Sequence, residues 1–142
     1  MRLVDANVLI YAVNEAAVHH RQSHAWLDTA LGGPEPVGFA WTVLLAFLRL
    51  ATHPSVFARP LTSEQATSVV RGWLARPGAL LVDPTPRHAD VLAGLLTESG
   101  TAGNLVNDAH LAALAVEHSA TITTFDADFG RFAGVSWSRP GE

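Results

Sequence analysis

The chain has 142 residues, of which 49% are hydrophobic, and it carries a net charge of −4. This length suits a core that forms without disulfides or structural metal, so we expect a single domain over residues 1–142. All nine basic residues are Arg and there is no Cys, which excludes nucleotide-binding loops and Schiff bases that need Lys, as well as thiol nucleophiles. The absence of Cys also agrees with the reducing cytoplasm, where we expect the protein to act.

The first 52 residues predict two strands and their helices. Leu3-Val4 predicts a short buried strand that leads into a turn and a helix, with Asp5 at the carboxyl end of the strand. Residues 17–31 predict a helix, and residues 37–40 a second short strand. Residues 41–52 are apolar nearly all round, which is typical of a helix that is buried on most sides or meets a partner.

The rest of the chain continues this alternation of helices and short apolar strands. We expect helices over residues 62–76, 86–98 and 104–118, strands over 79–82, 121–125 and 135–137, and a short helical turn over 126–132. Short strands with continuous apolar runs, alternating with helices, predict an α/β fold whose parallel sheet is covered by helices on both faces.

The apolar segments are too short for export or membrane insertion. The N-terminal residues lack the basic segment and apolar stretch that mark a signal peptide. The longest strongly apolar run, residues 37–48, falls short of the about 20 residues that cross a bilayer. We therefore expect a soluble protein with no membrane contact.

Acidic side chains gather where the predicted strands end. Asp5, Asp83, Asp126 and Asp128 follow strands, and ligands of open α/β sheets bind at the carboxyl ends of the strands. Asp108 lies early in a predicted helix, on or beside its apolar stripe, where a charge is costly unless it is paired or binds a metal. Because no Lys is available to pair with these acids, Mg²⁺ or Mn²⁺ is the favoured partner, and phosphodiester hydrolysis the favoured reaction.

Each of these acids also has a structural interpretation. Asp5 and Asp126 stand where helices begin and fit the role of N-cap equally well. Asp128 fits a solvated side chain, and Asp83, before Pro84, fits a turn. For Asp108 a metal site is favoured over a purely structural role.

Three His residues near the start of the second predicted helix raise the question of a zinc site. His20 and His24 are four positions apart on the predicted helix, and His19 lies beside them. A zinc site would need a third ligand, and the chain has no His-Glu-x-x-His motif. We therefore expect these side chains to lie on a solvated face.

Five segments resemble a known family. Residues 4–12, 107–115 and 123–129 are similar to the opening, third-acid and fourth-acid motifs of PIN-domain proteins. Residues 41–49, together with His53-Pro54, and residues 103–106 are similar to segments of the VapC toxins of mycobacteria and related actinobacteria. Any one of these acid-containing stretches is weak evidence, but three in the right order within 142 residues are specific.

This resemblance implies a fold, an activity and a site. The implied fold is a PIN-like three-layer α/β/α sandwich with a central, mainly parallel sheet of four to five short strands. The implied activity is that of an endoribonuclease toxin of a type II toxin–antitoxin pair, using Mg²⁺ or Mn²⁺. The implied residues are the catalytic and metal-binding Asp5, Asp108 and Asp126, a fourth metal ligand at Asp128, and the supporting residues Asn7 and Thr124.

The sequence departs from the family pattern at one position. PIN domains usually carry a Glu three residues before an Arg on the helix after the second strand, and here Ala46 takes that place before Arg49. Asp90 and Glu98 are candidates to supply the missing charge. The alternative is a catalytically weak or inactive PIN domain that acts as a protein- or RNA-binding module. Other acid-rich α/β domains, such as response-regulator receivers, normally use a Lys, which this chain lacks.

The expected partners follow from the charge, the apolar helices and the resemblance. A net charge of −4 is unusual for a nucleic-acid-binding protein, but metal ions at the acids would reverse the local sign. Arg2, Arg49, Arg131 and Arg139 are candidates for contacts with RNA phosphates. The resemblance further implies a homodimer and a VapB-like antitoxin with a basic tail, with DNA bound only indirectly through the antitoxin.

Overall fold

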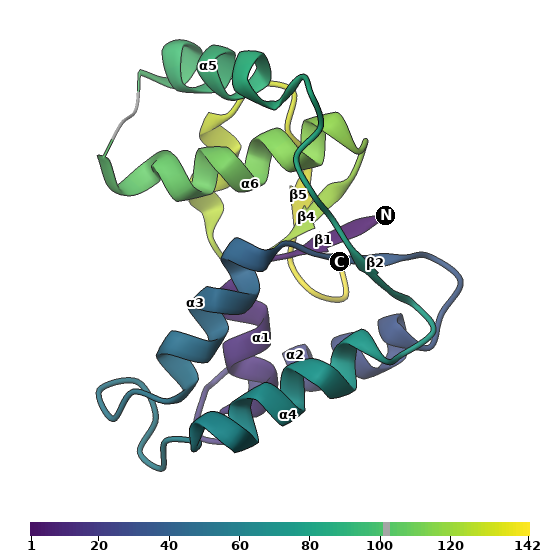
Figure 1. The fold of residues 1–142 in the computed structure, drawn as a ribbon, viewed down its shortest axis with the longest axis vertical. Helices are drawn as coiled ribbons and strands as arrows, with labels where there is room; N and C mark the ends of the chain where they lie inside the picture. Colours follow the sequence, from purple (N-terminus) through teal and green to yellow (C-terminus); the bar gives the residue numbers. More distant parts are fainter. Residues whose placement is uncertain (101–102) are drawn as a thin grey trace.

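The centre of the molecule is a five-stranded, fully parallel sheet (Figure 1). A computed structural model describes residues 1–100 and 103–142. The strands are β1 (Arg2–Val4), β2 (Val37–Phe39), β3 (Ala79–Leu81), β4 (Thr121–Thr123) and β5 (Trp137–Ser138), in the spatial order β3-β2-β1-β4-β5. The expected α/β sandwich with a mainly parallel sheet is confirmed.

Helices cover the two faces of the sheet in two groups. Helices α1 (Ala6–Val13), α2 (His20–Leu31), α3 (Trp41–Ala51) and α4 (Ser63–Leu74) lie on one side, and α5 (His88–Ser99) and α6 (Val106–Glu117) on the other (Figure 1). Two short 3-10 helices, Gly103–Leu105 and Ala127–Arg131, precede α6 and follow β4. Parallel crossovers are right-handed, so the helices change sides when the chain, after β3, returns past β1 to reach β4. The carboxyl ends of β1 and β4 therefore flank the point where the strand order reverses, which is where such sheets bind ligands.

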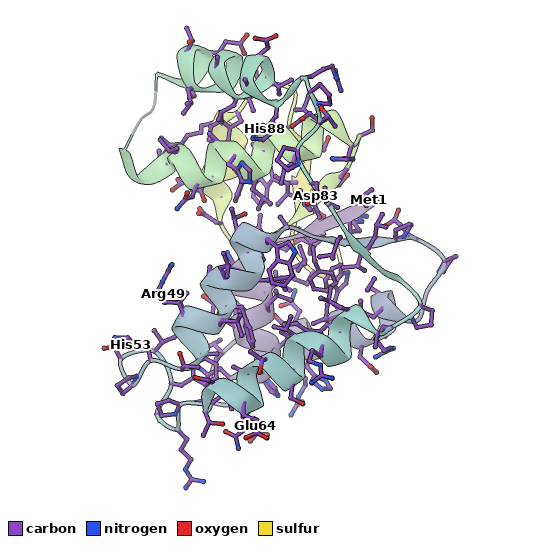
Figure 2. All side chains as sticks on the ribbon, in the orientation of Figure 1. Met1, Arg49, His53, Glu64, Asp83 and His88 are labelled. Carbon is purple, nitrogen blue, oxygen red and sulfur yellow. The ribbon has the colours of Figure 1, made fainter. Side chains whose placement is uncertain are left out.

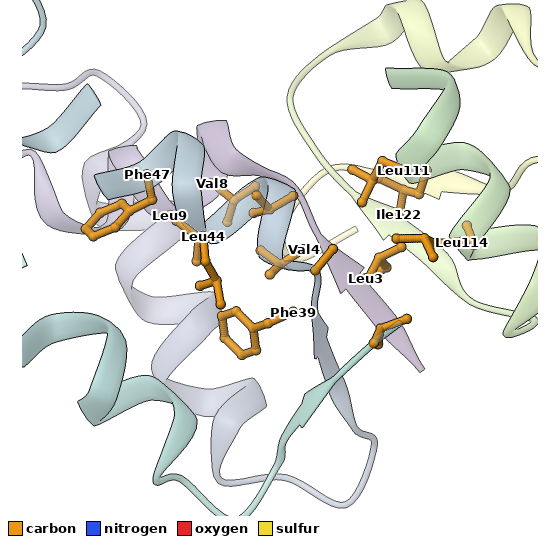
Figure 3. Packing of buried hydrophobic residues seen from close by; sticks show 14 of the residues in the cluster. Leu3, Val4, Val8, Leu9, Phe39, Leu44, Phe47, Leu111, Leu114 and Ile122 are labelled. Atoms are coloured by element: carbon orange, nitrogen blue, oxygen red, sulfur yellow. The ribbon is translucent and has the colours of Figure 1, made fainter. Parts of the chain in front are cut away.

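The core consists of two apolar layers that share the central strand β1. Leu3 and Val4 are fully buried and point to opposite sides of the sheet (Figure 3). Leu3 lies on the side of α6, near Leu114, whereas Val4 lies on the side of Val8 of α1 (Figure 3). Alternating side chains of one strand can be buried in this way only when both faces are covered, as the continuous apolar run predicts.

The edge strand β3 and helices α2 and α3 differ from the sequence-based expectation. Leu80 and Leu81 are 46% and 45% exposed, because β3 is the edge strand and α5 and α6 cross back toward β4, away from it. Helix α2 begins at His20 rather than at residue 17, and Val18 is 96% exposed. Helix α3 is buried on one side only, since Leu45 is 57% exposed, so burial on most sides is wrong and contact with a partner stays a prediction.

A buried polar cluster joins α5 to α6. The carboxylate of Glu117, whose side chain is buried, accepts hydrogen bonds from Thr85 N (2.9 Å), Thr85 Oγ1 (2.5 Å) and His88 Nδ1 (2.5 Å). His88, labelled in Figure 2, shares a second hydrogen bond of 2.9 Å with Nδ1 of His110. Burial alone would raise the pKa of Glu117, but these hydrogen bonds outweigh it and hold the pKa below its ordinary value. These hydrogen bonds specify one relative position of α5 and α6, which apolar contacts alone do not.

In the part of the chain that the structure describes, no helix has the length and apolarity that crossing a bilayer requires.

Candidate active site

A network of hydrogen bonds joins the ends of β1 and β4. Asp5 caps α1: its Oδ1 accepts from Ala6 N (2.7 Å), and its Oδ2 accepts from Thr124 Oγ1 (2.8 Å). Thr124 Oγ1 in turn accepts from Asp126 N (2.9 Å). Asn7 donates to Asp5 Oδ2 (3.3 Å) and to Thr124 Oγ1 (3.1 Å). The two acids at the strand ends are thus held in one arrangement by the hydroxyl of Thr124 and the amide of Asn7, the two residues expected to support them.

Helix α6 brings a third carboxylate to this network. The pKa of Asp108 is raised to about 6, first by burial and then by the negative charges of Asp5, Asp126 and Asp128. Arg131 lowers it, but the three neighbouring carboxylates outweigh that single cation. Burial likewise raises the pKa of Asp5, against the hydrogen bonds from Thr124 and Ala6. Asp5, Asp108 and Asp126 therefore form a region of uncompensated negative charge.

The N-cap and solvated interpretations hold for some of these acids as well. Asp5 and Asp126 both accept a backbone hydrogen bond at the start of a helix, as their spacing predicts. The Asp128 side chain is 54% exposed and forms an ion pair with Arg131 at 3.3 Å, so it lies at the solvent-exposed edge of the acids. A capping carboxylate keeps free lone pairs on its oxygens, so capping and ligand binding are compatible.

A cleft of about 330 Å³ opens beside the acids, between α1, α3 and α6. Asp5 and Asp108 lie on its polar side. The rest of the wall is contributed by Ala6, Thr42, Val43, Leu45, Ala46, Arg49, Asn107 and Leu111. Ala46 thus lines the cleft that holds the acids, which places the departure from the family pattern inside the site. Neither Asp90 nor Glu98 lines this cleft, and both belong to α5, so they do not replace the missing charge there.

One of the four candidate phosphate-binding Arg residues stands at the cleft. Arg49 is exposed on α3, points outward in Figure 2, and makes no ion pair within residues 1–100 and 103–142. Arg2 is engaged with Glu35 at 3.1 Å, and Arg131 with Asp128. Arg49 is therefore the cation best placed to meet an anion that enters the cleft.

Two residues of the cleft were not anticipated from the sequence. Asn107 directly precedes Asp108, and Thr42 lies four positions before Ala46 on the same face of α3. The helical spacing of four residues between Thr42 and Ala46 was the signal that could have identified Thr42.

The expectation of a solvated His face is only partly correct. His24 is exposed, but His20 donates from Nδ1 to the carbonyl oxygen of Tyr11 at the end of α1 (2.8 Å). His19 stacks on Phe125, with ring centroids 4.3 Å apart. Two of the three rings therefore make contacts within the protein.

The acids suit a hard cation that keeps part of its water shell. Within residues 1–100 and 103–142, no three His, Asp or Glu side chains converge closely enough to enclose a metal without other ligands. Mg²⁺ is usually held by one or two carboxylates together with waters and substrate phosphate. Asp5 and Asp108 offer such a pair, and a divalent cation would relieve the repulsion that raises the pKa of Asp108. The residues present fit Mg²⁺ or Mn²⁺.

Comparison with known proteins decides the family. A sequence profile of the PIN domain matches residues 2–135. Ribonuclease VapC37 of Mycobacterium tuberculosis is 61% identical over 140 residues, which cover 99% of this chain and 97% of that protein. The chain belongs to the VapC family of PIN-domain proteins.

Other relatives agree with this assignment in sequence and in fold. Ribonuclease VapC33 of M. tuberculosis is 41% identical over 140 residues, covering 99% of this chain and 98% of that protein. The crystal structure of M. tuberculosis VapC20, described as a sarcin–ricin loop cleaving toxin, superposes with a TM-score of 0.72 at 17% identity, covering 99% of this chain and 100% of that one. VapBC2 of Rickettsia felis, solved with a DNA fragment from its promoter, reaches 0.72 at 20% identity and covers 97% of both chains. The PIN fold is thus shared well beyond the close VapC relatives.

Proposed function

We propose that this VapC protein is a metal-dependent endoribonuclease and the toxin of a type II toxin–antitoxin pair. The observation that carries the proposal is that Asp5 and Asp108 line one cleft, where burial and the charges of Asp5, Asp126 and Asp128 raise the pKa of Asp108 to about 6. Perturbed carboxylates that share a cleft are typical of catalytic sites. Relatives that align over 99% of the chain are named ribonucleases, which supports RNA as the substrate.

The roles of the side chains follow from their positions. Asp5 and Asp108 would hold Mg²⁺ or Mn²⁺, with Asp126 completing the site directly or through water. The ion, when bound, supplies an activated water and stabilises the leaving oxygen. Thr124 and Asn7 fix the orientation of the Asp5 carboxylate, and Arg49 contacts an RNA phosphate at the mouth of the cleft.

The partners in this proposal are an RNA substrate, a second copy of the chain and a VapB-like antitoxin. Structural neighbours include VapBC2 of R. felis and a toxin–antitoxin complex of Klebsiella pneumoniae, which supports an antitoxin partner. Trp41 and Leu45 on α3, together with Val106 at the start of α6, are exposed apolar side chains that an antitoxin helix or a second protomer would cover. DNA would be reached only through the antitoxin, and the site of action would be the cytoplasm.

Ala46 favours a second candidate function. Its place in the wall of the cleft removes one carboxylate that PIN domains usually have there. With fewer acids the domain could bind RNA or protein without cutting it. The replacement Ala46→Glu separates the two candidates, because it returns the acid to a wall that already faces Asp5 and Asp108.

The deciding experiment compares variants of the purified protein on total RNA, with Mg²⁺ or with EDTA, and maps the new 5′ ends. We expect discrete cleavages with wild type in Mg²⁺, none with Asp5→Asn or Asp108→Asn, and unchanged cleavage with Asp90→Asn. Asp90 is a matched control because it is also a first-turn acid, on α5, and does not line the cleft. Cleavage that appears only with Ala46→Glu would favour the binding module. Cleavage by wild type that persists in EDTA or in Asp108→Asn would overturn the proposed role of the acids.

A further inference from the structure

Three aromatic rings from separate segments meet beside the acid network. The rings of His19 and Phe125 stack nearly parallel, with 4.3 Å between their centroids and 14° between their planes. Tyr11 meets Phe125 edge-on, at 5.4 Å and 60°, and lies 5.7 Å from His19. Tyr11 belongs to α1, His19 immediately precedes α2, and Phe125 follows β4. We refer to Tyr11, His19 and Phe125 as the aromatic cluster.

The backbone of the cluster is tied directly to the acid network. Phe125 stands between Thr124 and Asp126, and its N–H donates to Asn7 Oδ1 at 3.1 Å. The same Asn7 side chain donates to Asp5 and to Thr124. The amide of Asn7 therefore fixes the position of both the Asp5 carboxylate and the backbone of Phe125.

The cluster is neither part of the buried core nor fully solvated. Each of its three side chains is half-buried. His19 is the N-cap residue of α2, yet its side chain makes no capping hydrogen bond. Within residues 1–100 and 103–142, neither the imidazole of His19 nor the hydroxyl of Tyr11 makes a hydrogen bond, so both keep polar edges for a ligand. Tyr11 and Phe125 also pack against the core, so the polar edges of the cluster are open to solvent or to a ligand.

We propose that the aromatic cluster is a stacking site for one unpaired nucleobase of the RNA substrate, next to the phosphodiester that is cut. This inference rests on the proposed function. Proteins recognise single-stranded RNA by stacking splayed-out bases on aromatic and His side chains and by hydrogen-bonding the base edges. His19 and Phe125 cover one face of each other, so the base would stack on the outer face of one of these two half-buried rings. The Tyr11 hydroxyl and the imidazole would provide the edge contacts.

The position of the cluster defines what it would select. Phe125 is the immediate chain neighbour of Asp126, so a base on the cluster belongs to a nucleotide close to the cut bond. Base pairing would prevent a base from reaching the rings, so the cluster selects RNA that is unpaired at this nucleotide. Stacking tolerates every base, so sequence preference would come from the edge contacts of Tyr11 and His19.

The test measures binding and cleavage of a short, unstructured oligoribonucleotide that contains a mapped cut site. The variants are Phe125→Leu, which keeps apolar bulk, Phe125→Tyr, which keeps the ring, and His19→Ala. His24→Ala is the matched control, because His24 is an exposed ring on α2 outside the cluster. Thermal unfolding of each variant checks that it is folded.

We expect Phe125→Leu and His19→Ala to weaken binding by at least about fivefold, the lower limit for loss of one stacked base. Phe125→Tyr and His24→Ala should bind as wild type does. The loss should appear in KM more than in kcat, and an abasic nucleotide at the stacking position should bind wild type and Phe125→Leu equally. Equal binding of the intact oligonucleotide by wild type and by folded Phe125→Leu would overturn the proposal.

The outcome separates this inference from the proposed function. Binding is measured in EDTA, and an unstructured oligoribonucleotide without a mapped cut site is the probe if the protein cuts no RNA. Without cleavage, weaker binding by Phe125→Leu than by His24→Ala would still support the stacking site, while the proposed nuclease activity alone would fail. With cleavage and unchanged KM in Phe125→Leu, only the stacking site would fail.

Discussion

Replacing Asp108 by Asn should make the metal-free protein more stable while it abolishes the proposed cleavage. A rise of the pKa from 3.8 to about 6 corresponds to roughly 3 kcal/mol of repulsion and desolvation, at about 1.36 kcal/mol per pKa unit. Solvent screens part of this repulsion at a partly open cleft. Asn also forfeits about 0.3–1 kcal/mol of attraction between a first-turn carboxylate and the start of α6. We expect a net gain of about 1 kcal/mol at pH 7.5, or roughly 3–5 °C in Tm.

The pH dependence of this gain has a defined sign. The pKa of Asp108 is higher in the folded than in the unfolded chain, so the folded state binds the proton more tightly. Its contribution to the stability of wild type therefore falls as the pH rises from 3.8 to about 6, and the advantage of Asp108→Asn grows over the same interval.

The assay is thermal or urea unfolding of wild type, Asp108→Asn and Asp90→Asn, in EDTA and in Mg²⁺, at pH 4 and pH 7.5. Asp90→Asn loses the same kind of first-turn acid without relief of repulsion, so it should not gain stability. Mg²⁺ should raise the Tm of wild type more than that of Asp108→Asn. If Asp108→Asn in EDTA at pH 7.5 is no more stable than wild type, the acids do not repel one another as argued here.

Two further replacements test the two polar networks, one around Glu117 at the end of α6 and one around Thr124 after β4. Glu117→Gln should cost about 2 kcal/mol near neutral pH, because it replaces a carboxylate that accepts three hydrogen bonds. The pKa of Glu117 is lowered in the folded state, so this difference should be complete above 4.5 and fade as the pH falls through the lowered pKa, as urea unfolding can show. Thr124→Val should cost about 1–3 kcal/mol, since it leaves Asp126 N without its acceptor. Loss of the hydrogen bond from Thr124 should also raise the pKa of Asp5 further, which moves the acid limb of the cleavage pH profile to higher pH. An acid limb that stays in place would contradict the role of Thr124.

The fold could be predicted from local patterns because they agree with one another. Continuous apolar runs such as Leu3-Val4 indicate strands that are buried on both faces, and the alternation with helices then determines a parallel sheet. The exposure of Leu80 could not be predicted this way, because it depends on where the chain crosses after β3. A run of three apolar residues is the same in a central strand and in an edge strand.

The sequence predicted that Asp5 and Asp126 lie at one sheet edge, but not the hydrogen bonds around them; their catalytic role stays a prediction. Asp5 and Asp126 follow strands, which suffices to place them at one sheet edge. That Thr124 Oγ1 bonds to both, and that Asn7 also holds the backbone of Phe125, depends on side-chain orientations that spacing does not specify. The cluster of Glu117, His88 and Thr85 was missed for the same reason, since its members come from separate segments and form no motif.

The pairing of β1 with β4 makes the site dependent on both ends of the chain. Asp5 and Thr124 share a hydrogen bond across 119 positions of sequence, and β4 is among the last strands to be synthesised. A nascent chain therefore carries Asp5 long before it carries the partners that orient it. The carboxylate cluster can assemble only after β4 has been made and has paired with β1, so a growing polypeptide that lacks β4 also lacks the assembled centre.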